Sequence, residues 1–211
     1  MKAGAIRSRG WDGMCDFLLK QPVARKRILA FAACSRCVWD RVQLECNRRA
    51  LLTSELFADG EVTRDELVRA WQAVRFEPVV YSEWCLGAAG PAEDVFSAQM
   101  VPRSQADDDA VQAFQPSYDP HSELSRERVA IGFDVFGHRF RRVAFDQCWR
   151  TEAVVGLARG MYESRDFGPM PVLADALEDA GCADADVLAH CRGDGPHVRG
   201  CWVVDLVLGQ E

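Results

Sequence analysis

The sequence has no run of about 20 apolar residues, the length that a membrane-spanning helix needs. Its first residues, MKAGAIRSRG, hold no apolar core followed by a cleavage site, which argues against a secretory signal. A Walker loop, a dinucleotide-binding glycine fingerprint and an H-E-x-x-H motif are all missing. We therefore expect a cytoplasmic protein with reduced cysteines and no membrane partner, and we assign no catalytic or cofactor-binding residue.

Positive charge is also in deficit, because 25 Lys and Arg face 32 Asp and Glu, for a formal net charge of −7. Nucleic-acid binding takes much of its affinity from Lys and Arg at phosphates, so this balance argues against a nucleic-acid partner. Hydrophobic residues make up 48% of the chain, which suits a folded core rather than a disordered chain. The partner that remains is a protein.

Apolar residues recur at steps of three and four near both ends of the chain, which predicts a mainly α protein. We expect a helical region over residues 1–75 and a second helical module over residues 127–211. Between them, residues 76–126 are punctuated by proline and glycine and are predicted to be a variable, loop-rich insert. The two helical regions could also pack into one domain.

Individual signals mark several helices. One apolar stripe over residues 22–47 predicts a single helix, and Thr63-x-x-Glu66 is a capping box that starts another. In the C-terminal module, apolar periodicity, proline at a first helical position and glycine past a last one predict four more helices. They cover residues 151–163, 171–180, 185–192 and 197–208.

The strongest chemical signal is a cluster of cysteine and histidine near the C-terminus. Cys182, Cys191, His197 and Cys201 are spaced C-x8-C-x5-H-x3-C, and three cysteines with one histidine are a usual structural zinc set. His190 could take the place of a neighbouring ligand. The sequence therefore offers these residues as a candidate metal site, with zinc as the candidate cofactor.

Other interpretations of the cysteines and histidines stay open. The cysteines could pack in the core while the histidines form hydrogen bonds or helix caps. Cys191 or Cys201 could act as a nucleophile with His197 as its base. Cys34-x-x-Cys37 is a further metal or redox pair, although residues three apart on a helix can simply share a buried face.

These observations favour a non-catalytic binding or assembly module over an enzyme. The alternative is an interaction module stabilised by zinc through three cysteines and one histidine. A hydrolase that depends on cysteine and histidine is the second alternative.

Three C-terminal runs resemble a large paralogous family of uncharacterised planctomycete proteins. They are FGHRFRRVAFD (136–146), ARGMYESRDFGPMPVLADALEDAGC (158–182) and LAHCRGDGPHVRGCWVVDLVLGQE (188–211). The run RKRILAFAACSRCVW (25–39) is similar to a helix of the same family, which usually has its second cysteine at the place of Ser35 and an arginine at that of Cys37. The resemblance covers residues 14–75 and 127–211. It implies the division into modules and no particular reaction.

Overall fold

The computed structural model describes residues 2–18, 20–21, 24–75, 119–140 and 143–210. Throughout these ranges the chain is mainly α, and they contain no strand, which confirms the predicted fold class. Of the expected loop-rich insert, residues 76–126, the part from 76 to 118 lies outside the described residues. Within the described ranges, no helix is both long and apolar enough to cross a membrane.

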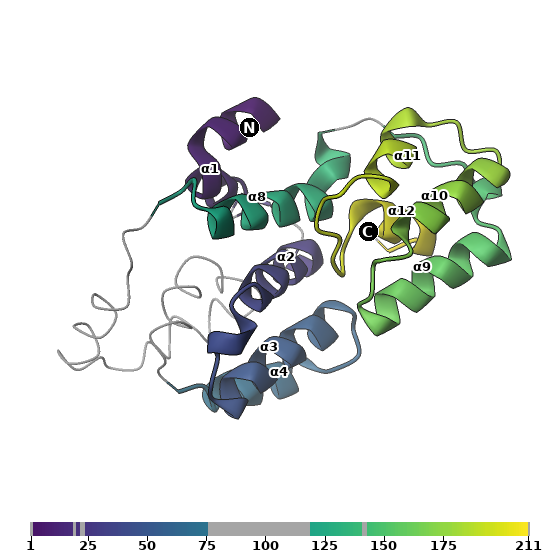
Figure 1. Cartoon of the computed structure of the whole chain (residues 1–211). Helices are drawn as coiled ribbons and strands as arrows, with labels where there is room; N and C mark the ends of the chain where they lie inside the picture. Colours follow the sequence, from purple (N-terminus) through teal and green to yellow (C-terminus); the bar gives the residue numbers. More distant parts are fainter. Residues whose placement is uncertain (1, 19, 22–23, 76–118, 141–142, 211) are drawn as a thin grey trace. The chain divides into compact units, whose positions relative to one another are not determined.

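The chain divides into two compact units, Met1–Val129 and Ala130–Glu211. The first unit contains α1 (Ala3–Leu18), α2 (Ala24–Arg36), α3 (Glu45–Ala58), α4 (Arg64–Gln72) and the first part of α8 (Glu123–Phe136). In this unit α2 packs on α3, and α3 packs on α4 (Figure 1). The capping box predicted at Thr63 and Glu66 is confirmed, because each side chain bonds the backbone N–H of the other residue.

The prediction of one helix over residues 22–47 is wrong. α2 ends at Arg36, and a short 3-10 turn, η1 (Trp39–Arg41), precedes α3. This turn lets Val38 and Val42 reach a buried cluster that also contains Ala50 and Leu51 of α3. The apolar stripe thus belongs to two helices and the turn between them.

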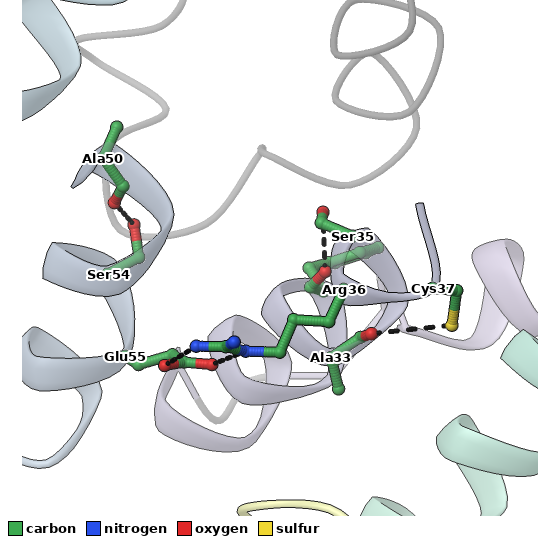
Figure 2. A network of polar contacts seen from close by, with 8 residues as sticks. Ala33, Ser35, Arg36, Cys37, Ala50, Ser54 and Glu55 are labelled. Atoms are coloured by element: carbon green, nitrogen blue, oxygen red, sulfur yellow. Dashed lines mark hydrogen bonds and ion pairs between the residues drawn. The ribbon is translucent and has the colours of Figure 1, made fainter. Parts of the chain in front are cut away.

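Polar contacts join α2 and α3, as Figure 2 shows. The Arg36 guanidinium donates two hydrogen bonds to the Glu55 carboxylate, at 2.7 and 2.8 Å. Cys37, just past the end of α2, has its Sγ 3.7 Å from the Ala33 carbonyl oxygen of that helix, and Cys34 is buried. Within the described ranges, one group of three or more side chains could hold a metal ion, and it lies in the second unit. It does not include Cys34 or Cys37, so it does not support metal binding at the C-x-x-C pair.

Replacing the fully buried Asn47 with alanine should destabilise the first unit by about 2 kcal/mol. Its side-chain amide donates to the Arg75 carbonyl and accepts from the Arg75 N–H, both at 2.9 Å, so alanine removes both bonds. Hydrogen exchange of α3 and α4 measures the loss. Thr53→Ala, which removes a bond only within α3, is the control and should change stability by less than about 0.5 kcal/mol. Equal effects of the two variants would contradict this role of Asn47.

The second unit begins with the last turns of α8 and continues with short helices around one core (Figure 1). α9 (Glu152–Ser164) contacts α10 (Met170–Asp179) and α12 (Trp202–Leu208), and α11 (Ala185–Cys191) contacts α10 and α12. Thr151 and Asp184 cap α9 and α11 with their side chains. Short 3-10 turns, η2 (Gly137–Arg139) and η3 (Gln147–Trp149), lie before α9.

The last helix is shorter than residues 197–208, because it begins at Trp202. Gly200 has φ +91°, a conformation that ends helical geometry and that glycine adopts without strain. Residues 192–200 are therefore a connection between α11 and α12, called here the 192–200 loop. His197 lies on this loop, and Cys201 lies directly before α12.

Candidate metal centre

Four side chains from separate parts of the second unit converge on one point. Asp134, His190, His197 and Cys201 each offer a ligand atom, and these atoms all lie within 4.8 Å of one another. We refer to these residues as the Asp134 cluster. All four side chains are largely shielded from solvent, with exposed fractions of 2% for Asp134, 12% for His190 and 8% for His197, while Cys201 is fully buried. The cluster could hold a metal ion.

Asp134 is the centre of the contacts in this cluster. Its Oδ1 lies 3.0 Å from His190 Nε2 and 2.9 Å from His197 Nδ1, and its Oδ2 accepts a hydrogen bond from the Val198 N–H at 3.0 Å. Burial opposes ionisation of this carboxyl, but the hydrogen bonds from the two histidines outweigh it and hold the pKa of Asp134 below its ordinary value. The carboxylate is therefore the stable form.

The place of Asp134 in its helix is unfavourable by itself. The residue lies in the last turn of α8, where the helix dipole is negative and a carboxylate is repelled. Its neighbours Val135 and Phe136 are fully buried. A buried acid at this end of a helix needs compensating partners, and the two imidazoles provide them.

The two histidines are held by packing as well as by Asp134. The ring of His190 meets the ring of His197 edge-on, with centroids 4.8 Å apart, and lies 5.0 Å from the ring of Trp202. Burial lowers the pKa of His197, but the hydrogen bond and charge of Asp134 prevail and raise it. His197 Nε2 is buried, and a hydrogen bond to the Gly193 backbone also raises the pKa of His197.

Cys201 brings a thiol to the same point, 3.2 Å from His190 Nε2. It occupies the residue before α12 without capping that helix through its side chain. Burial, followed by the charge of Asp134, raises the pKa of this thiol well above its ordinary value, while the amides of Val203 and Val204 favour the thiolate. A nearby cation would be needed to make the thiolate the stable form at neutral pH.

The structure brings together three residues singled out in the sequence and adds one. His197, Cys201 and the substitute ligand His190 belong to the cluster, whereas Cys182 and Cys191 are buried in the adjoining hydrophobic core and lie outside it. Burial, with smaller contributions from the charges of Cys182 and Asp134, raises the pKa of Cys191 to about 12.

Sequence reasoning missed Asp134. It precedes His190 by more than fifty residues, and nothing in the C-terminal spacing refers to it. One signal was present, because Asp134 is the single Asp, Glu, Lys or Arg between Arg128 and Arg139 in an otherwise apolar run. A charged residue buried within such a run needs a partner.

The geometry differs from that of a nucleophile with its base. In a catalytic triad the base uses one ring nitrogen for the nucleophile and the other for the orienting acid. Here His197, the predicted base, contacts Asp134 through Nδ1, whereas the ring nitrogen at 3.2 Å from Cys201 Sγ is His190 Nε2, which also lies close to Asp134. Cys201 is also fully buried, so these contacts do not favour the hydrolase alternative.

Comparison of the chain with protein-family models, with curated proteins and with solved structures gave no match. The resemblance to the planctomycete family stays a prediction.

Proposed function

We propose that Ala130–Glu211 is a zinc-stabilised helical module, with Asp134, His190, His197 and Cys201 as the four ligands, in a non-catalytic cytoplasmic protein that binds or assembles with another protein. One observation carries this proposal. Four potential ligand atoms, from α8, α11, the 192–200 loop and the residue before α12, lie within 4.8 Å of one another and are largely shielded from water.

The charges of the cluster support a divalent cation. An ionised Asp134, an ionised Cys201 and two neutral imidazoles carry two negative charges, which one divalent ion neutralises. Neutrality matters because an uncompensated charge in a buried site costs several kcal/mol. The low pKa of Asp134 favours the carboxylate that a metal requires, whereas burial raises the pKa of Cys201 well above its ordinary value, so that its thiolate would need the cation itself, assisted by the nearby amides of Val203 and Val204.

The donor set supports zinc among the divalent ions. Imidazole, thiolate and carboxylate are the three kinds of side chain that zinc uses, and four of them make a closed tetrahedral site. A catalytic zinc site keeps one position open for water, whereas this cluster offers four protein ligands. The arrangement therefore favours a structural role over a catalytic one.

The competing interpretation is a buried hydrogen-bond network without metal. Protonated His197 beside ionised Asp134 would also be neutral, and the raised pKa of His197 favours this pair at low pH. In this network Cys201 has only a weak role, because the single Nε2–H of His190 is shared between Oδ1 and Sγ. A shared cation accounts for all four atoms.

Metal analysis of the full-length protein tests the proposal. Protein purified without added metal and dialysed without chelator should retain about one zinc ion per chain. A folded protein that contains no zinc, and takes up none when zinc is added, would contradict it. Cobalt substitution gives a second readout, since a cobalt–thiolate bond produces an absorption band that a hydrogen-bond network cannot produce.

A further inference from the structure

The side chains of the Asp134 cluster can contact one another by hydrogen bonds without a metal, as well as bind a metal together. We infer that the metal in this site is exchangeable, and that its binding and release order and loosen the 192–200 loop while the helices stay folded. This inference rests on the proposed function. The site would thereby be regulatory, because the order of the 192–200 loop would respond to the concentration of a divalent, zinc-like cation.

The first step is that the ligands can satisfy one another. Asp134 Oδ1 lies at hydrogen-bond distance from both histidines, and Oδ2 accepts from the Val198 N–H. In an all-cysteine site the thiolates repel one another when the metal leaves and have no donors to replace it. When the cation leaves, Cys201 takes up a proton from solvent and the ring protons of the two histidines move to the nitrogens that face Asp134, so an acceptor then faces donors in a hydrogen-bonded cluster.

The second step is that the helices have a core of their own. α9, α10 and α12 contact one another, directly or through α11, around a buried cluster that includes Leu173, Leu177 and Val204. None of these three fully buried residues is a proposed ligand. Zinc fingers unfold without metal because they lack such a core, whereas this unit has one.

The 192–200 loop is the part of the unit that responds to the cation. The 192–200 loop has no helical structure, and its residues Gly193, Asp194 and Gly195 are exposed. Its contacts with Asp134 are made by His197 and by the Val198 N–H. A cation would add bonds at His190, His197 and Cys201, which lie before, within and directly after the loop. Closing this short, glycine-containing segment at three points restricts it far more than hydrogen bonds alone.

Hydrogen exchange of the full-length protein, loaded with zinc or freed of it by a chelator that is then removed, tests this inference. The amides of the 192–200 loop should exchange at least tenfold faster without zinc, and added zinc should restore slow exchange. α9 and α10 should stay protected in both states. Asp134→Asn keeps the side-chain volume but weakens the contacts with His197 and with the Val198 N–H. This variant should give fast loop exchange that zinc does not change.

The possible failures are distinct. Loss of protection in α9 and α10 on zinc removal would make zinc a requirement for folding, which overturns the inference and leaves the proposed function standing. Equal loop exchange in the zinc-bound and zinc-free proteins would also overturn it. If the protein takes up no zinc at all, the proposed function fails and the inference fails with it.

Discussion

Cys201→Ala is expected to lower zinc affinity by more than about 100-fold, because it removes a ligand, and even the loss of an outer-shell partner costs 10–100-fold. Alanine fits this fully buried position without strain, so helix content should stay unchanged. A competition titration against a coloured zinc chelator measures the affinity. Loss of the zinc–thiolate bond, rather than unfolding, then explains the result.

Cys191→Ala is the matched control. Cys191 is as fully buried as Cys201 and belongs to the same hydrophobic core, but it lies outside the Asp134 cluster. Its replacement should leave zinc affinity within about threefold of the parent, since no ligand is lost. Equal loss of zinc in the two variants would contradict the proposed ligand set and would favour the three-cysteine set predicted from sequence spacing.

Gly137→Ala is expected to destabilise the second unit by about 3 kcal/mol or more. A Cβ at this position would lie 2.5 Å from Nε1 of Trp202 and closer still to its Cδ1, and that side chain is fully buried, so the ring or the backbone would have to shift. Because the Trp202 ring also packs against His190, displacing it should weaken zinc binding as well. Hydrogen exchange of α9 and α12 and a zinc titration measure the two effects.

Gly156→Ala provides the control with the opposite sign. This glycine lies inside α9 on an exposed face, where a Cβ would meet nothing within 4 Å. Alanine is a better helix former than glycine and should stabilise the unit by about 0.5–1 kcal/mol. Stability losses of similar size at Gly137 and Gly156 would show that the close approach to Trp202 is not the cause.

The sequence predicts helices well where a local signal fixes an end. Thr63 with Glu66 and Thr151 with the apolar pattern after it mark helix starts that the structure confirms within a residue. Pro171 lies in the first turn of α10, and Gly181 lies just past its end, as the proline and glycine rules indicate. These signals depend on neighbouring residues alone, which explains their success.

Predictions fail where contacts distant in sequence decide the outcome. The stripe over residues 22–47 is periodic, but the chain turns at η1 so that Val38 and Val42 can join a cluster with α3. Likewise, the histidine and cysteine spacing correctly indicates the C-terminal part of the chain, but the carboxylate that joins the cluster comes from α8. Spacing alone could not show whether Cys191 or Asp134 faces the histidines.

X-ray absorption at the zinc edge of the zinc-loaded, full-length protein tests the proposed ligand set. We expect a four-coordinate ion with one sulfur ligand at about 2.3 Å and three nitrogen or oxygen ligands at about 2.0–2.2 Å, from Cys201, His190, His197 and Asp134. Three sulfur ligands would contradict it in favour of Cys182, Cys191 and Cys201 with His197. A shell of oxygen ligands alone would contradict it by placing the ion outside the cluster.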